Sequence, residues 1–339
     1  MSNVLVTGGA GFIGSNFIHY LLGEYPEVSV VNLDRLTYAA SLENLKGLEE
    51  SGRYRLVLGD VADRVGVEAL FAAEGFDTVV HFAAESHVDR SITDPEAFVR
   101  TNVVGTWNLL EAARRHWRTA TGWREGVRFC HVSTDEVYGS LGNDDPAFTE
   151  ESPYRPNSPY SASKASSDHF VRSYFHTFGL PVVTTNCSNN FGPRQHAEKL
   201  IPTVLRHGLA GKPIPVYGNG RNVRDWLYVL DHCRALDQVM HRGQPGRVYN
   251  IGADNEWANL DLVERIGLLL DEEHPEGAPH RRLITFVTDR PGHDWRYAVN
   301  SSRLRAELGW RPRESFDEAL RATIRWYMAK WADALPVSD

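Results

Sequence analysis

The chain has 339 residues, of which 42% are hydrophobic and 24% are charged, as in a globular protein with a sizeable core. This composition excludes a disordered chain, a fibre and a disulfide scaffold. The net charge is −8, from 36 Lys and Arg against 44 Asp and Glu. A surface of that sign attracts neither nucleic acid nor an anionic membrane, so we expect no nucleic-acid partner and no membrane partner. A small anionic ligand stays open, because it needs only a local cationic pocket.

The cellular compartment is predicted from the N-terminus and the cysteines. The first residues lack a basic segment and run directly into an apolar strand, so we expect no signal peptide. No stretch approaches the roughly 20 apolar residues that cross a bilayer. Cys130, Cys187 and Cys233 are widely spaced and odd in number, which favours buried thiols in a reducing cytoplasm over disulfides.

Apolar runs typical of strands alternate with segments of helical spacing over the first 185 residues. This alternation predicts an α/β fold with a doubly wound parallel sheet. Ligands bind such a sheet at the carboxyl ends of its strands, where polar and glycine-containing segments follow here. The expected strands are residues 4–6, 28–33, 54–58, 78–82, 127–132 and 181–185, and the expected helices are residues 13–22, 98–113 and 161–177.

The pattern changes after residue 190, where prolines interrupt it and shorter strands lie among loops. Residues 214–217 and 248–251 resemble strands, and residues 259–270 and 316–331 have the spacing of amphipathic helices. We predict a first domain over residues 1–190 and a smaller second domain over 191–332, followed by a frayed tail at 333–339. Segments near residues 225–255 are candidates to return to the first domain.

A glycine loop follows the first strand and opens the first helix. Gly8, Gly11 and Gly14 have the spacing G-x-x-G-x-x-G, which permits a tight turn and brings helix N–H groups close to a pyrophosphate. Asp34 lies 20 residues beyond Gly14, at the end of the second strand, where a carboxylate accepts from a ribose 2′-OH and repels a 2′-phosphate. The pattern therefore favours NAD over NADP, against the alternative of purely structural glycines.

Asp60 ends the third expected strand and has two interpretations. Its carboxylate can accept from an adenine amino group, or it can cap a helix that begins near Arg64. The residues themselves leave these alternatives open.

Tyr160 and Lys164 form a Y-x-x-x-K pattern at the start of an expected helix, which puts both side chains on one face. A nearby ammonium stabilises a phenolate, so we expect Lys164 to lower the pKa of Tyr160. Such a tyrosine can take a proton from an alcohol that is being oxidised by nicotinamide. Thr134, at the end of a strand, can hydrogen-bond the same hydroxyl.

With the glycine loop, the acidic strand end and the Y-x-x-x-K pattern in this order, the chain resembles the extended short-chain dehydrogenase/reductase family. Members of that family oxidise, epimerise or dehydrate nucleotide sugars with bound NAD. The resemblance covers nearly the whole chain and implies a Rossmann-type domain with a smaller C-terminal substrate domain. The further cofactor contacts that we expect from it are Phe12, Ile13, Val61, Ala83, Thr101 and Asn190.

Two adjacent carboxylates, Asp135 and Glu136, follow the strand that ends at Thr134. A 4-epimerase needs only the tyrosine, whereas removal of water from a sugar needs a base for the C5 proton and an acid for the C6 hydroxyl. Two carboxyl groups in different protonation states can divide these roles. The alternative is an acidic turn in which Asp135 caps a short helix.

Seven stretches, taken in order and including the two pairs above, resemble the nucleotide-sugar 4,6-dehydratases within that family. The resemblance implies that Tyr160 takes the O4 proton, Glu136 takes the C5 proton and Asp135 protonates the departing C6 hydroxyl. The implied reaction is a hydro-lyase reaction on dTDP-glucose, with NAD regenerated and retained. The stretches are residues 81–91, 135–136, 158–164, 186–190, 198–202, 224–227 and 289–294.

The resemblance also implies where the nucleotide sugar binds. Arg224 and Arg290 are candidates to hold the diphosphate, although each has an adjacent aspartate with which it can form an ion pair instead. His293 is either a substrate contact or a plain loop histidine. The remaining expected substrate contacts are Ser86, Thr134, Asn189, Lys199, Leu200, Pro215, Tyr217 and Asn259.

Several alternatives remain at this stage. The nearest are a dehydratase acting on a UDP, GDP or CDP sugar and a UDP-glucose 4-epimerase, and a third is a catalytically silent NAD-binding protein.

The 14 histidines show no H-E-x-x-H pattern, so we expect no metal, and His81 and His131 are expected in the core. The family pairs the helices near residues 98–113 and 161–177 in a homodimeric four-helix bundle, although a monomer can also bury such helices.

Overall fold

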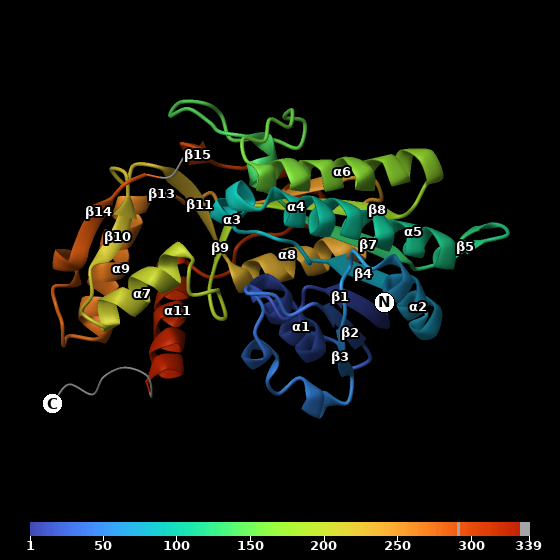
Figure 1. The fold of residues 1–339 in the computed structure, drawn as a ribbon, viewed down its shortest axis with the longest axis horizontal. Helices are drawn as coiled ribbons and strands as arrows, with labels where there is room; N and C mark the ends of the chain where they lie inside the picture. The colour runs from blue at the N-terminus through green and yellow to red at the C-terminus, as the bar shows by residue number, and fades with distance from the viewer. Residues whose placement is uncertain (290–291, 333–339) are drawn as a thin grey trace.

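A seven-stranded parallel sheet forms the centre of the computed structural model, which describes residues 1–289 and 292–332 (Figure 1). Its strand order is β12-β8-β7-β4-β1-β2-β3, so the chain first builds outward from β1 and then turns back to the other side through β4. This confirms the predicted doubly wound sheet. The strands are β1 (Asn3–Thr7), β2 (Ser29–Asp34), β3 (Tyr54–Leu58), β4 (Thr78–His81), β7 (Arg128–Thr134), β8 (Val182–Cys187) and β12 (Val248–Ile251).

Helices cover both faces of the sheet, because neighbouring strand residues point to opposite sides. Val4 and Val6 of β1 pack on the side of α1 (Phe12–Glu24) and α8 (Val229–Arg242), while Leu5 packs on the other side. The helices on that other side are α2 (Arg64–Glu74), α5 (Thr106–Trp117) and α6 (Pro159–Phe178), with the short α3 (Val88–Thr93) and α4 (Pro95–Phe98) beside α6.

The expected single helix over residues 98–113 is wrong in its first half. The chain ends α4 at Phe98, forms a π-helical segment over Val99–Gly105 and only then begins α5. A π segment inserts an extra residue into a helix and leaves the apolar spacing on either side nearly unchanged. Within it, Asn102 donates to Glu85 O at 3.0 Å and accepts from Glu85 N at 2.9 Å, which ties the helix to the loop after β4.

A smaller lobe lies at the left of Figure 1 and is built from the later part of the chain. In it β9 and β13 flank β11, β10 pairs with β14, and α7, α9 and α11 pack together. β12 lies instead in the large sheet, paired with β8. The elements of the lobe are β9 (Asn189–Phe191), α7 (Leu200–Leu209), β10 (Ile214–Tyr217), β11 (Val223–Tyr228), β13 (Glu256–Ala258), α9 (Asn259–Glu273), β14 (Ile284–Val287), β15 (Arg296–Tyr297) and α11 (Phe316–Trp331). Helix α10 (Ser302–Leu308) packs instead against β12 and α8.

Short elements complete the described chain. A hairpin of two brief strands follows α5, and four 3-10 turns lie in loops. They are β5 (Arg118–Thr119) and β6 (Gly122–Trp123), with turns at Leu42–Leu45, Glu49–Ser51, Asp135–Tyr138 and His280–Leu283.

Helices α7 and α8 were missed by the sequence analysis. Pro202 read as an interruption, but it occupies the first turn of α7, where a helix has no acceptor for the N–H that proline lacks. The three cysteines are free and buried, as expected. None of the helices in the described ranges is both long and apolar enough to span a bilayer. The predicted tail at 333–339 lies outside the described residues.

Candidate active site

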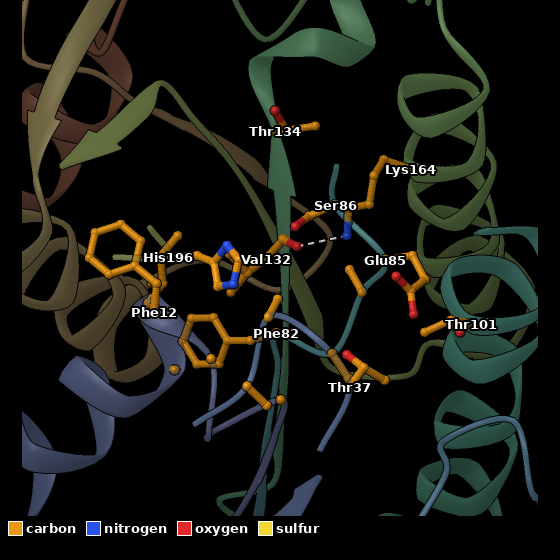
Figure 2. A pocket seen from close by; sticks show the side chains of 18 of the residues that line it. Phe12, Thr37, Phe82, Glu85, Ser86, Thr101, Val132, Thr134, Lys164 and His196 are labelled. Carbon is orange, nitrogen blue, oxygen red and sulfur yellow. Dashed lines mark hydrogen bonds between the residues drawn. The ribbon is translucent and has the colours of Figure 1, made fainter. Parts of the chain in front are cut away.

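A cavity opens at the carboxyl edge of the sheet, beside the position where the strand order reverses between β1 and β4. Figure 2 shows Phe12, Phe82 and His196 toward one side of it and Lys164, Glu85 and Thr101 toward the other. Every residue that the sequence predicted at the cofactor lines this one cavity. These residues are Gly8, Gly11, Phe12, Ile13, Gly14, Asp34, Asp60, Val61, Ala83, Thr101, Tyr160, Lys164 and Asn190.

The glycine loop leaves space that side chains would fill. Gly8 has φ +73°, and a Cβ on it would lie 2.6 Å from Ala83 N. A Cβ on Gly14 would lie 2.5 Å from Gly8 O, which is a backbone clash. Helix α1 starts after Gly11, which has no side chain to cap it, so its first N–H groups and positive dipole end face the cavity. This donor set fits the pyrophosphate of a dinucleotide.

Asp34 stabilises the glycine loop through hydrogen bonds from backbone N–H groups. Its Oδ2 accepts from Ala10 N at 2.8 Å and its Oδ1 from Leu36 N at 2.8 Å. Burial raises the pKa of Asp34, and these backbone hydrogen bonds oppose the shift. The carboxylate thus shapes the turn and also lines the cavity where a ribose is expected.

Asp60 does not cap the following helix. Asp63 performs that role, because its Oδ1 accepts from Val65 N at 3.1 Å at the start of α2. Asp60 instead accepts from Ala62 N at 2.8 Å and from Arg35 Nη1 at 3.2 Å, and it lines the cavity. Of the two interpretations, the helix cap is wrong.

Candidate catalytic residues lie at the end of strand β7 and in the turn that follows it. Thr134 ends the strand, and its Oγ1 accepts from Glu136 N at 3.3 Å, which caps the 3-10 turn Asp135–Tyr138. The alternative in which Asp135 is the cap is therefore wrong. The turn brings Thr134, Asp135 and Glu136 into the cavity wall together.

Asp135 is in a setting that favours its neutral form. Only 2% of the residue is exposed, and its Oδ2 has no hydrogen-bond partner. Burial raises the pKa of Asp135 well above its ordinary value, and the charges of Glu136 and Asp225 act in the same direction. A carboxylic acid held protonated near neutral pH is suited to proton donation.

The helix α6 positions Tyr160 and Lys164 on its first turns. Ser158 and Ser161 form a capping box with Pro159 at the first helical position, so the helix start is firmly set. Lys164 is buried, and its Nζ donates to Val132 O of β7 at 2.9 Å, as the dashed line in Figure 2 marks. The ammonium is thereby pinned against the strand that carries the carboxylates.

The prediction that Lys164 lowers the pKa of Tyr160 is wrong, because the surroundings of Tyr160 in the protein together raise it. Burial raises the pKa of Tyr160 well above its ordinary value, the nearby charge of Glu136 raises it further, and a hydrogen bond with Thr134 opposes the rise. The sequence showed the ammonium but not the burial, and burial has the larger effect here.

The expected substrate contacts divide into two groups. Ser86, Thr134, Asn189 and Lys199 line the cavity. Leu200, Pro215, Tyr217, Arg224, Asn259 and His293 do not, and Arg290 lies outside the described residues.

The second group belongs to the smaller lobe. Pro215 and Tyr217 lie on β10, and the ring of Tyr217 lies 6.5 Å from that of His293 in an edge contact. Arg224 is buried on β11 and donates to the carbonyls of Val223 and Asp294 at 2.7 and 2.9 Å. Their roles toward a nucleotide sugar stay predictions.

Several cavity residues escaped the sequence analysis. Arg35, Thr37, Phe82, Glu85 and Cys187 each lie within three residues of a predicted site residue or strand end, and that proximity was the only signal in the sequence. Gln195 and His196 carried no such signal, because the loop that brings them to the cavity follows no periodic pattern. Within the described ranges no group of three or more His, Cys, Asp or Glu could hold a metal ion.

A doubly wound parallel sheet with a glycine loop after β1 and a buried Tyr–Lys pair beside it defines a dinucleotide-dependent enzyme of the short-chain dehydrogenase/reductase class. The family model described as GDP-mannose 4,6 dehydratase matches residues 5–323. The chain belongs to this family of nucleotide-sugar dehydratases, within the extended short-chain dehydrogenases/reductases.

Individual relatives and solved structures show which enzymes this chain is similar to. The chain is 53% identical over 333 residues to a dTDP-glucose 4,6-dehydratase from Neisseria meningitidis serogroup B, covering 97% of this chain and 94% of the relative. A crystal structure of a dTDP-glucose 4,6-dehydratase from Streptomyces venezuelae with NAD and TYD bound has a TM-score of 0.88 and 45% identity, covering 97% and 98% of the two chains. A UDP-glucose 4-epimerase from Thermotoga maritima has a TM-score of 0.85 at 27% identity, covering 97% and 99%.

Gly14→Ala should weaken the binding of the dinucleotide. The new methyl group would meet the backbone of Gly8 and Gly9, so the loop must shift away from the phosphate position. We expect about a tenfold or larger loss in NAD affinity, measured by titration of cofactor-stripped protein. Gly23→Ala on the same helix is the matched control, because nothing lies within 4 Å of its added Cβ. Equal affinities in the two variants would contradict the assigned phosphate site.

Proposed function

We propose that the chain converts dTDP-glucose into dTDP-4-keto-6-deoxyglucose and water, with NAD as a tightly held cofactor. The observation that carries this proposal is the Asp135–Glu136 pair beside Tyr160 in the cavity that also contains the glycine loop. A 4-epimerase has no use for a buried neutral carboxyl group and an adjacent second carboxylate. The relatives named above, at about half identity over nearly the full length, support the same reaction.

The cofactor site follows from the cavity wall. Gly11, Phe12 and Ile13 would bind the pyrophosphate with backbone N–H groups, and Asp34 would accept from the adenosine ribose. Lys164 would donate to the other ribose from its position against β7. When bound, NAD supplies a hydride acceptor and donor and a positive charge at its nicotinamide ring.

The oxidation needs a proton acceptor at the sugar O4. Tyr160 and Thr134 lie together in the wall and can contact one hydroxyl group. A cation near a phenol favours the phenolate, and Lys164 lies one helical turn after Tyr160 on α6. Tyr160 then accepts the O4 proton while Thr134 orients that oxygen.

The elimination divides between the carboxyl groups. A 4-keto group makes the C5 proton acidic, and Glu136 accepts it as a carboxylate. Asp135, held neutral by burial and by its neighbours, gives its proton to the C6 hydroxyl, which leaves as water. With a hydride returned to C6, Glu136 returns its proton to C5. Tyr160 then still holds the O4 proton and Asp135 lacks one, so passage of one proton from Tyr160 to Asp135 through solvent restores both groups.

The nucleotide contacts are proposed from placement in the chain. Lys199 lines the cavity, and Arg224 lies where its charge reaches Asp135. Their charges suit a diphosphate, and the same role is proposed for Arg290 from the sequence alone. Asn189, Leu200, Asn259 and His293, together with Pro215 and Tyr217 at the base, complete the proposed substrate site, and Ser86 contacts the sugar.

We also propose a division into domains at residue 190, with α8 and β12 returning to the first domain, a cytoplasmic location and a homodimer. Apolar side chains are exposed on the helices predicted to pair: Val99 and Val104 on the π segment at 53% and 37%, and Phe170 on α6 at 40%. The π segment and α6 pack against each other on one side of the sheet, so these side chains can form one face (Figure 1). Pairing two such faces would produce the four-helix bundle.

The reaction is tested by incubating purified protein with dTDP-glucose and, separately, with UDP-glucose, without added cofactor. We expect that only the dTDP sugar loses the mass of one water. Mass spectrometry of the sugar nucleotide measures this loss. Loss from both sugars would preserve the chemistry and remove the base preference. Conversion of UDP-glucose to UDP-galactose without mass change would favour the epimerase, and no change after NAD is added would favour a silent binding protein.

Glu136→Gln should stop exchange of the C5 proton with deuterated solvent, because the amide cannot act as a base. We expect a loss of about 10²- to 10⁴-fold in exchange rate with the NAD content unchanged. Asp135→Asn is the companion variant: exchange should continue while release of water slows. Exchange at the normal rate in Glu136→Gln would rule out its role as the base.

Phe170→Glu should convert the dimer into a monomer, because it places a charge in the proposed bundle face. Sedimentation at micromolar concentration measures the change. Leu268→Glu is the matched control, since Leu268 is 53% exposed on α9 in the smaller lobe. A wild-type monomer, or dissociation by both variants, would contradict this interface.

A further inference from the structure

A buried polar network lies directly behind the catalytic wall and is centred on Asp168 of α6. Only 4% of Asp168 is exposed. Its Oδ1 lies 3.0 Å from His131 Nε2, and its Oδ2 accepts from Ser133 Oγ and from Tyr154 OH, both at 2.9 Å. Hydroxyl groups that donate to one oxygen, with a ring nitrogen beside the other, suit an acceptor-only carboxylate.

The network reaches the active site through two routes. Asn186 on β8 donates to Asp168 Oδ2 at 3.4 Å and to Thr134 O at 3.2 Å, which ties the carboxylate to the end of β7. Lys164 lies one helical turn before Asp168 on α6, so the two side chains share a face. Asp168 thus contacts the strand that carries the reacting groups and faces the ammonium beside them.

Lys164 needs a counter-charge because water cannot solvate it. The residue is 3% exposed, and its Nζ donates to the neutral Val132 carbonyl. Burial lowers the pKa of Lys164, and Asp168 is the strongest influence in the opposite direction. An uncompensated buried ammonium would lose its proton.

The other titratable groups that face this pair do not supply a negative charge. Cys187 on β8 faces Lys164, but burial raises the pKa of its thiol to about 12, so the thiol is neutral. His81 on β4 and His131 on β7 have pKa values lowered by burial and are neutral as well. Tyr154 also faces Asp168 and is a neutral donor. Among the described groups that act on Lys164, Asp168 is therefore the one carboxyl group.

We propose that Asp168 is a positioning residue, whose buried carboxylate keeps Lys164 cationic and thereby allows Tyr160 to ionise. The inference rests on the proposed function only in the role of Tyr160 as proton acceptor. Asp168 touches neither the sugar nor the cofactor position, because it does not line the cavity. It acts through Lys164 and, by way of Asn186, through the end of β7.

Asp168→Asn tests the proposal by removing the charge while keeping the size. Without the carboxylate Lys164 is neutral at lower pH, so the Tyr160 phenolate loses its stabilising cation. We expect ionisation of Tyr160 to move to higher pH by about one unit or more. The measurement is an ultraviolet difference titration of NAD-loaded protein against the same protein with Tyr160→Phe. Turnover at pH 7 should fall about tenfold, with the rising limb of the pH profile displaced in the same direction.

Two variants separate charge from structure. Tyr154→Phe removes one donor to Asp168 but leaves its charge, so Tyr160 should titrate as in the wild type even if the melting temperature falls. Asp168→Glu also keeps the charge and should keep the wild-type titration. If either moves the titration as far as Asp168→Asn does, or if Asp168→Asn does not move it, the proposal is wrong. A displacement of about one pH unit in either of these two variants would contradict the proposal even if Asp168→Asn does not fold.

A double-mutant cycle shows whether Asp168 acts through Lys164. In a Lys164→Met background, adding Asp168→Asn should not shift the Tyr160 titration further, whereas an independent effect would add. The titration needs no sugar substrate. The proposed dehydration can therefore fail while the inference holds, and an active wild type with an unshifted Asp168→Asn would defeat the inference alone.

Discussion

The order of the parallel strands is the constraint on which the site depends. Because the chain turns back between β1 and β4, the loops after these two strands separate and leave a crevice at the sheet edge. The glycine loop after β1 and the catalytic turn after β7 both project there, since all seven strands point the same way. Residues from distant parts of the chain therefore meet without any special local structure, and the dinucleotide and carboxylate sites share one wall.

Burial within that wall then determines which groups are charged. It raises the pKa of Asp135 and Tyr160 and lowers the pKa of Lys164, so each would become neutral if it were alone. Specific neighbours modify this tendency in opposite ways. Glu136 and Asp225 reinforce the neutral form of Asp135, whereas Asp168 opposes the neutral form of Lys164. An acid and an ammonium can thus coexist within one buried region because their nearest charges differ.

Much of this could be predicted from the sequence, and the limits have physical reasons. Strands, the glycine loop, Asp34 and the Tyr160–Lys164 pair are encoded in local runs and fixed spacings, which survive without tertiary information. Burial is not encoded in that way, so the direction of the Tyr160 pKa was missed. The π segment escaped because one inserted residue barely alters apolar spacing. Pro202 misled because a proline in a first helical turn reads like a proline in a loop.

Asp168 is a second example of burial that cannot be predicted from the sequence. In the sequence it is one acidic position on a helix, four residues after the lysine, and such positions are usually solvated. Only the packing of α6 against β7 reveals that its oxygens meet His131 and Ser133 inside the protein. A buried carboxylate with several polar partners and a cation nearby is costly unless its partners are all present. The polar residues behind the wall therefore form one unit with the groups in front of it, and the protonation of the site depends on both layers together.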